Sequence, residues 1–248
     1  TVYIGGGTPT SLDEKLLDFL LISLEKILKK SKENTIEANP ESLTKDKIKL
    51  FLRRGINRIS IGVQSLRDEK LKFLERIHTS SQAIEKVMEA KKLGFKNINI
   101  DLIYGLPHEE LDEFKKEIKE AVKLPITHLS CYMLTLKKSF PLYKYIKDIS
   151  EEEVARMYRF LMRYLPKRGF YQYEVSNFAK RNYFSRHNII YWKNKEYIGL
   201  GASSVSYTKG IRTKRVADVR KYIQLIKENK SPIVFKEKLS PSKRAKET

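Results

Sequence analysis

Glycine and polar residues stand at the ends of several short apolar segments, where they could bind a ligand. The first segment ends in Gly5-Gly6-Gly7-Thr8, the second holds Glu37 just before Asn39, the third ends at Gln64, and the fourth carries Asp101. Consecutive glycines allow backbone groups to approach a ligand closely, although glycine in such a turn often only supplies a positive φ. Their spacing matches neither a dinucleotide-binding turn nor a P-loop. The two carboxylates could hold a divalent ion, act as an acid–base pair, or hydrogen-bond a ribose or an amine.

A histidine and the single tryptophan of the chain occur together in the segment Ser185–Trp192. Imidazole is a common axial ligand of haem iron, so His187 is a candidate haem ligand. Packing explains most histidines in such surroundings, and a structural role is the alternative. The one cysteine, Cys131, lies within an apolar segment, where we expect a buried and unreactive thiol.

The composition excludes several classes of protein. The chain has 248 residues, 41% of them hydrophobic, which is enough for a sizeable core and too apolar for a disordered protein. A single cysteine excludes a disulfide within the chain and a multi-cysteine metal or iron–sulfur site built from this chain alone. The longest apolar stretch, residues 16–24, is too short and too polar to span a bilayer. We therefore expect a reducing, cytoplasmic setting.

The chain carries 50 Lys and Arg against 30 Asp and Glu, a formal net charge of +20. Lysine and glutamate alternate in segments such as 85–92 and 113–123, which predicts solvent-exposed helix faces. No arginine-rich run with stacking aromatic residues occurs, so a nucleic-acid partner is disfavoured. Peripheral contact with an anionic membrane surface is compatible with the charge.

Apolar segments, glycine-rich turns and amphipathic stretches alternate along the first two thirds of the chain. This order predicts an α/β fold with a parallel sheet, open or barrel-like. We expect strands at 2–4, 35–38, 57–61, 97–103 and 128–133, and helices at 12–27, 45–54, 68–77, 81–93, 109–122 and 151–165. Ser11 and Glu14 have the spacing of a capping box. Beyond these elements we expect a strand at 171–176, a long loop at 177–192, a strand with its turn at 197–207, and a helix at 216–228.

Seven segments together resemble one known family. They are, in order, YIGGGTPTSL, TIEANPESL, RISIGVQS, ERIH, INIDLIYGLP, EVSNFA and HNIIYW. The chain is similar to the coproporphyrinogen dehydrogenase-like radical SAM proteins from residue 1 to about residue 246. The Arg76-Ile77-His78 tripeptide and the HNxxYW tract, His187–Trp192, favour the haem-chaperone branch of that family.

The resemblance implies a partial (β/α) barrel of the radical SAM type, with parallel strands and outer helices, followed by a small α+β extension. We expect a barrel lacking its first βα unit at 1–170, a sheet extension with the HNxxYW loop at 171–230, and the start of a truncated C-terminal domain at 231–248.

The resemblance also implies the ligands and the residues that bind them. S-adenosylmethionine (SAM) would lie at the strand ends beside a [4Fe-4S] cluster. Its contacts would be Gly6, Gly7, Thr8, Glu37, Gln64, Arg76 and Asp101, with Thr135 and Val205 as weaker candidates, and His187 would be the haem ligand. The implied function is binding haem and delivering it to haem proteins. The alternative is an oxygen-independent coproporphyrinogen III dehydrogenase, which oxidatively decarboxylates propionate side chains.

The sequence departs from the family at the cluster. The family's C-x-x-x-C-x-x-C loop precedes the GGGTP turn, and this chain has no such loop. We therefore expect an interior part of a longer protein, which cannot by itself hold the cluster or cleave SAM, because iron needs thiolate ligands. The resemblance makes one geometric prediction: the side chains of Thr8, Glu37, Gln64 and Asp101 point to one rim of the fold.

Overall fold

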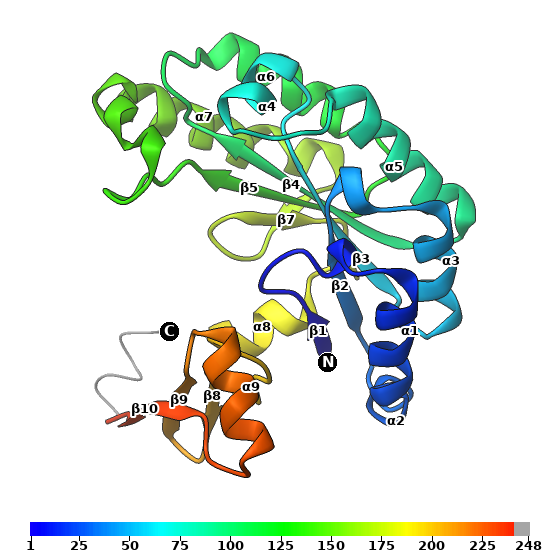
Figure 1. The fold of residues 1–248 in the computed structure, drawn as a ribbon. Coiled ribbons are helices and arrows are strands. Elements are labelled where there is room, and N and C mark those ends of the chain that lie inside the picture. The colour runs from blue at the N-terminus through cyan, green and yellow to red at the C-terminus, as the bar shows by residue number, and fades with distance from the viewer. Residues whose placement is uncertain (241–248) are drawn as a thin grey trace. The chain divides into compact units, whose positions relative to one another are not determined.

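A seven-stranded sheet forms the centre of the larger part of the molecule. The structure is a computed structural model that describes residues 1–240. The strands are β1 (Val2–Ile4), β2 (Asn34–Ala38), β3 (Arg58–Gln64), β4 (Asn97–Tyr104), β5 (His128–Met133), β6 (Tyr171–Gln172) and β7 (Asn177–Ala179). Their order is β1-β2-β3-β4-β5-β7-β6; β1 to β5 are parallel, and β7 and β6 are antiparallel to their neighbours. The predicted α/β fold with a parallel sheet is confirmed (Figure 1).

Helices alternate with the parallel strands and cover one face of the sheet (Figure 1). They are α1 (Glu14–Ser23), α2 (Glu25–Leu28), α3 (Lys45–Arg53), α4 (Asp68–Phe73), α5 (Ser80–Leu93), α6 (Leu111–Ala121) and α7 (Glu151–Tyr164), with 3-10 turns η1 (Pro9–Ser11), η2 (Pro40–Ser42), η3 (Pro141–Asp148) and η4 (Pro166–Arg168). The core joins strand residues such as Ile59 and Ile100 to helix residues such as Phe51, Phe114 and Leu161, all fully or almost fully buried. None of the helices described is long and apolar enough to cross a membrane.

The predicted capping box at Ser11 and Glu14 is wrong. Asp13 is the N-cap of α1, and its carboxylate accepts a hydrogen bond from the amide of Leu16 at 2.8 Å. Ser11 belongs to η1, where its hydroxyl donates to the carbonyl of Thr8. Pro9 starts that extra turn, so the helix begins three residues after Ser11.

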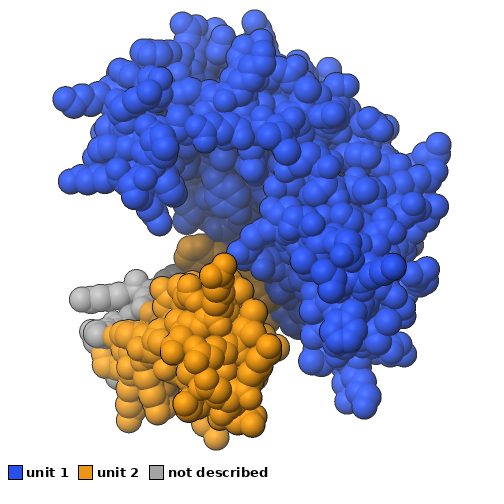
Figure 2. Space-filling view, viewed as in Figure 1, with its two compact units in different colours: residues 1–184 blue, residues 185–248 orange. Residues whose placement is uncertain are grey.

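The chain divides into two compact units, residues 1–184 and 185–248 (Figure 2). The second holds α8 (Arg186–Trp192), α9 (Val219–Lys227) and an antiparallel sheet of β8 (Val205–Thr208), β9 (Ile211–Arg215) and β10 (Ile233–Lys238). The division differs from the boundaries expected at 170 and 230, because β6 and β7 pair with the sheet of the first unit. Residues 241–248 of the segment expected to begin a further domain, 231–248, lie outside the described residues.

Two predicted elements beyond residue 170 are wrong, and the strand expected at 171–176 is reduced to the two residues of β6. The loop expected at 177–192 contains β7 and the helix α8. The strand expected at 197–207 is reduced to a single bridge between Tyr197 and Tyr207, and β8 starts only at Val205. The helix expected at 216–228 is present as α9.

Candidate functional site

The two faces of the parallel sheet differ sharply in character, because successive side chains of a strand point to opposite sides. The face toward the helices is apolar. The opposite face, which we call the polar face, carries Tyr3, Thr35, Glu37, Arg58, Ser60, Asn99, Asp101, His128 and Ser130. Strand register places Glu37 beside Ser60, Ser60 beside Asn99, and Asp101 beside Ser130. The parallel pairing thus gathers polar groups from distant parts of the chain onto one surface.

Glu37 lies against the glycine turn that follows β1. Its carboxylate accepts hydrogen bonds from the Tyr3 hydroxyl at 2.7 Å and from the Gly6 amide at 3.0 Å. A Cβ atom at Gly5 would lie 2.5 Å from the Glu37 carboxyl carbon, so glycine is needed there for this close approach. Burial raises the pKa of Glu37, and the bonds from Tyr3 and Gly6 offset part of that rise. The sequence alone indicated no role for Tyr3, and it marked Gly5 only as part of the glycine run and not as a ligand contact.

The ends of β1, β2 and β3 meet through Thr8, Asn39 and Gln64. The Asn39 side-chain amide donates to the Thr8 hydroxyl at 3.0 Å. A Cβ at Gly62 would lie 2.7 Å from Asn39 Oδ1 and 2.8 Å from Gln64 Nε2, so both amide side chains lie over that glycine. Gln64 has φ of 65°, an uncommon value for a residue with a side chain, and it follows an irregularity in the β3–β4 register.

Asp101 occupies the middle of the polar face. It accepts hydrogen bonds from Asn99 at 2.8 Å and from Ser60 at 3.4 Å. Burial raises the pKa of Asp101; hydrogen bonds from Ser130, Asn99 and Ser60, and the charge of Arg58, act in the opposite direction. The negative charge of Asp101 also raises the pKa of Glu37. The register therefore places Glu37 and Asp101 on the same face, and Thr8 and Gln64 lie at the neighbouring strand ends through their contacts around Asn39 and Gly62.

Arg58 places a positive charge on the polar face. The residue is only 2% exposed, and its Nε has no hydrogen-bond partner among the described residues; the same holds for the hydroxyl of Thr35, its neighbour in register. The Arg58 charge lowers the pKa values of Glu37 and Asp101. Buried polar groups without a protein partner are usually satisfied by a ligand or by ordered water.

Two buried histidines hold this region together. His128 contacts Asn99 through Nδ1 and the Tyr173 hydroxyl through Nε2 at 2.7 Å, and burial keeps its pKa well below the ordinary value. His78 contacts Glu41 in η2 and the backbone carbonyl of Val63, each at 3.0 Å. His78 therefore ties the turn after β2 to the end of β3.

The remaining predicted residues lie elsewhere. Arg76 is half-buried in the turn after α4, two residues before His78. Thr135 follows β5, and its hydroxyl donates to the Met133 carbonyl at 3.4 Å. Val205 begins β8 of the second unit, which also contains His187.

His187 lies on a helix and not in the expected loop. The Ser185 hydroxyl caps α8 by accepting from the amide of Asn188. The His187 Nε2 lies 2.9 Å from the hydroxyl of Tyr191 one turn later, and the two rings are nearly perpendicular at 88°. Trp192 ends the same helix with 43% of its surface exposed. The sequence does not reveal this helix, because seven residues are too few to show a clear apolar periodicity.

The described residues do not fit an iron–sulfur cluster. Cys131 is buried on the helix-covered side of β5, and burial raises the pKa of its thiol. Within residues 1–240, no group of three or more His, Cys, Asp or Glu side chains could hold a metal ion. Any [4Fe-4S] cluster at the polar face would need thiolates from outside this chain.

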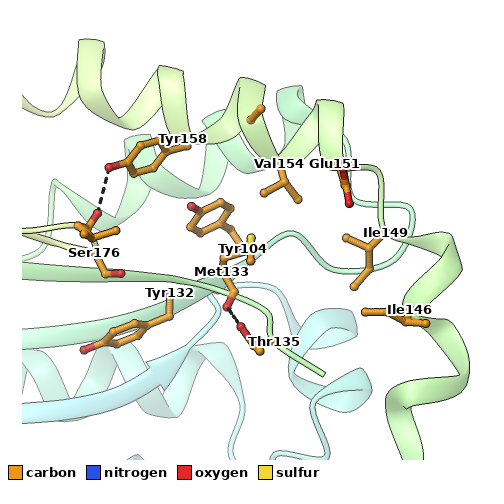
Figure 3. Close-up of a pocket in the computed structure, with 12 residues that line it drawn as sticks. Tyr104, Tyr132, Met133, Thr135, Ile146, Ile149, Glu151, Val154, Tyr158 and Ser176 are labelled. Atoms are coloured by element: carbon orange, nitrogen blue, oxygen red, sulfur yellow. Dashed lines mark hydrogen bonds between the residues drawn. The ribbon is translucent and has the colours of Figure 1, made fainter. Parts of the chain in front are cut away.

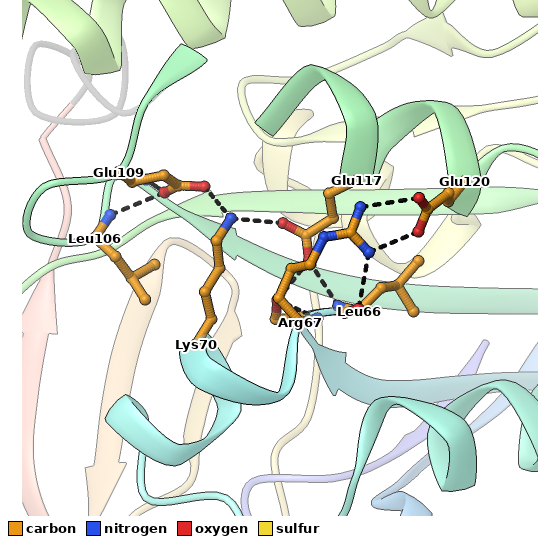
Figure 4. A network of polar contacts seen from close by, with 9 residues as sticks. Leu66, Arg67, Lys70, Leu106, Glu109, Glu117 and Glu120 are labelled. Atoms are coloured by element: carbon orange, nitrogen blue, oxygen red, sulfur yellow. Dashed lines mark hydrogen bonds and ion pairs between the residues drawn. The ribbon is translucent and has the colours of Figure 1, made fainter. Parts of the chain in front are cut away.

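A buried ionic network braces the loops after β3 and β4 (Figure 4). Lys70 Nζ contacts Glu109, and it lies 2.7 Å from Glu117. Glu117 also accepts from the Leu66 amide, and Glu109 accepts from the amides of Gly105 and Leu106. Glu117 is 2% exposed, so the prediction that 113–123 is uniformly a solvated face is wrong at this position.

Comparisons with known proteins show which proteins this chain is similar to. The family model of the radical SAM superfamily matches residues 1–121. The heme chaperone HemW of Bacillus subtilis is 38% identical over 240 residues, covering 94% of this chain and 63% of that protein. HemW of Escherichia coli is 36% identical over 233 residues, covering 90% of this chain and 61% of that protein.

The fold is also similar to that of a solved structure. Coproporphyrinogen III oxidase (HemN) from Escherichia coli, a radical SAM enzyme, superposes with a TM-score of 0.80 at 20% identity, covering 99% of this chain and 61% of that one. The chain thus spans less than two thirds of the length of each of these proteins. At this identity the structural likeness shows the fold alone.

Proposed function

Since the chain belongs to the HemW-like family of the radical SAM superfamily, we propose that it binds haem and delivers it to haem proteins, with SAM bound on the polar face. The observation that carries this proposal is the 38% identity to a heme chaperone over 94% of the chain. The proposed partners are haem and haem-accepting proteins, and the proposed setting is the cytoplasm. Peripheral contact with an anionic membrane surface is a secondary part of the proposal, supported by the net charge of +20.

The polar face suits a ligand with hydroxyl and ammonium donors. Burial raises the pKa values of Glu37 and Asp101, so a cationic or donor group beside them would stabilise their ionised forms. The glycine turn presents backbone amides next to Glu37, as the Gly6 contact illustrates. The proposed SAM contacts are Gly6, Gly7, Thr8, Glu37, Gln64, Arg76 and Asp101, with Thr135 and Val205 as weaker members.

His187 is the proposed haem ligand. Its imidazole stands on the short helix α8 with Tyr191 and Trp192, whose half-exposed aromatic rings suit the face of a porphyrin. The edge contact with Tyr191 restricts the orientation of the imidazole. Histidine is a common axial ligand of haem iron.

Haem titration followed by the Soret band tests this assignment. We expect His187→Ala to weaken haem binding at least about tenfold, since the iron–imidazole bond is lost. His108→Ala is the matched control, because it removes an exposed histidine from the first unit, and it should leave the affinity unchanged. Equal affinity of the wild type and His187→Ala would remove the proposed ligand.

An oxygen-independent coproporphyrinogen III dehydrogenase is the second candidate. The observation that favours it is the fold shared with HemN at a TM-score of 0.80. The two candidates are separated by anaerobic incubation with SAM and coproporphyrinogen III of a form of the protein that includes the family's C-x-x-x-C-x-x-C loop and carries a reconstituted cluster. Formation of protoporphyrinogen would favour the enzyme, and its absence alongside tight haem binding would favour the chaperone.

A further inference from the structure

A cavity of about 760 Å³ lies where η3 and α7 pass the ends of β4 and β5 (Figure 3). It is lined by Tyr104, Tyr132, Met133, Thr135, Ile146, Ile149, Glu151, Val154, Ala155, Tyr158, Val175 and Ser176. Its volume falls within the range of pockets that hold small molecules. Thr135 is the one residue that it shares with the proposed SAM contacts. Tyr104 and Met133 extend from the helix-covered side of their strands, opposite to Glu37 and Asp101.

The lining of this cavity selects against charged ligands. Three tyrosine rings, a thioether and five aliphatic or methyl side chains provide most of the wall. Glu151 is the one ionisable acid in it, and no Lys, Arg or His belongs to the described lining. An anionic ligand would therefore be desolvated without a cationic partner, which is costly. A cation is disfavoured by the net charge of +20 on the chain.

Tyr104 supplies the polar group that would orient a ligand. Its side chain is 5% exposed, and its ring packs on Phe114 with centroids 5.3 Å apart. Its hydroxyl forms no hydrogen bond to any described residue, and in Figure 3 it lies between α7 and the strands, within the cavity. Burial raises the pKa of Tyr104, so the phenol stays protonated and can donate. A buried phenol usually has a partner, and a ligand in this cavity would provide one.

We propose that this cavity is a binding site for an uncharged aromatic molecule of small-molecule size that accepts a hydrogen bond from Tyr104. Flat aromatic ligands pack well against tyrosine rings and against the Met133 sulfur. Tyr132 and Thr135 reach the cavity from the side of the polar face, but Glu37, Arg58, Asp101 and His187 do not belong to its described lining. The proposal therefore goes beyond the proposed haem and SAM functions.

Fluorescence titration with Nile red, an uncharged aromatic dye with a carbonyl acceptor, tests this proposal. We expect saturable binding that Tyr104→Phe weakens about three- to tenfold, because one neutral hydrogen bond is lost. Met133→Trp, which fills the cavity from a half-exposed position, should weaken binding at least about tenfold. Met88→Trp is the matched control, since Met88 is equally exposed on α5, and it should leave binding unchanged.

Three outcomes would overturn the proposal. If Met133→Trp binds Nile red as tightly as the wild type does, the dye binds outside this cavity. The predicted charge preference would be contradicted if the anionic dye 8-anilinonaphthalene-1-sulfonate bound as tightly as Nile red and if Tyr104→Phe and Met133→Trp weakened its binding too. Displacement of Nile red by SAM would make the cavity part of the SAM site. Thermal unfolding of each variant identifies any that fails to fold, and Tyr104→Phe and Met133→Trp probe the site independently. None of these readouts depends on haem, so failure here leaves the proposed function intact.

Discussion

Gly5 shows how one missing side chain shapes the candidate SAM site. A methyl group there would meet both the carboxylate of Glu37 and the ring of Tyr3 at 2.5 to 2.7 Å, whereas a methyl group at Gly7 would meet nothing within 4 Å. Gly5→Ala should therefore displace Glu37 and cost about 1–3 kcal/mol of stability, as overpacking does. Urea unfolding measures this cost. Gly7→Ala serves as the matched control and should be nearly neutral; equal effects of the two changes would contradict the assigned role of Gly5.

The raised pKa of Asp101 predicts how the stability of the protein depends on pH. Because burial raises its pKa, the folded protein binds more protons than the unfolded chain between the ordinary and the raised pKa. Stability therefore falls as pH rises through that interval. Asp101→Asn abolishes this titration and should stabilise the protein at neutral pH by roughly 1 kcal/mol, with the gain disappearing below about pH 4. SAM binding should weaken in the same variant.

The exposed Asp112 provides a control, because its pKa is shifted in the direction opposite to that of Asp101. The hydrogen bond from Lys115 lowers the pKa of Asp112, so its contribution to stability is present above its ordinary pKa and is lost as pH falls. Asp112→Asn should therefore not stabilise the protein at neutral pH. Unfolding midpoints of both variants between pH 3 and pH 7 check the signs. A gain for Asp101→Asn that does not change with pH would contradict the argument.

Helices α4 and α6 are joined by a buried network of ion pairs as well as by apolar packing. Lys70 is paired with Glu109 and Glu117, and all three are at least nine-tenths buried. Lys70→Met leaves two buried carboxylates without their cation and should cost about 3–5 kcal/mol. Lys115→Met, which removes a lysine of the surface pair with Asp112, should cost no more than about 0.5 kcal/mol. Denaturant unfolding compares them, and equal costs would refute a special role for the network.

The elements could be predicted from the sequence wherever local signals and tertiary structure agree. The five parallel strands and α3, α5, α6 and α7 lie where apolar periodicity placed them, and Gly94, with φ of 121°, ends α5 as expected. The buried Glu117 could not be predicted, because a helix pattern does not reveal that Lys70, 47 residues earlier, folds beside it. The irregular turn at Gln64 and the contact of Gly5 with Glu37 are likewise set by neighbouring strands. The family resemblance predicted Glu37, Gln64 and Asp101 as ligand contacts, but it did not predict the residues that hydrogen-bond to them.

The whole molecule distributes its apolar core unequally between the two units. Every member of the principal core cluster lies between Leu17 and Phe178. In the described part of the second unit, Tyr207 and Leu239 are the buried apolar side chains, while Ile198, Leu200 and Val234 are more than 60% exposed. A segment of about 60 residues with so little buried apolar surface is too small to be stable alone without further support.

The two units should therefore differ when they are produced separately. Residues 1–184 should unfold cooperatively and keep the Nile red site, since all the cavity-lining residues lie within this unit. Residues 185–248 alone should show no cooperative transition, because their described part, 185–240, buries too few apolar side chains to offset the loss of chain entropy. Thermal melts followed by circular dichroism test both expectations. A sharp transition in the 185–248 fragment would mean that its small sheet and two helices suffice for folding. Haem binding through His187 could then be assigned to that unit on its own.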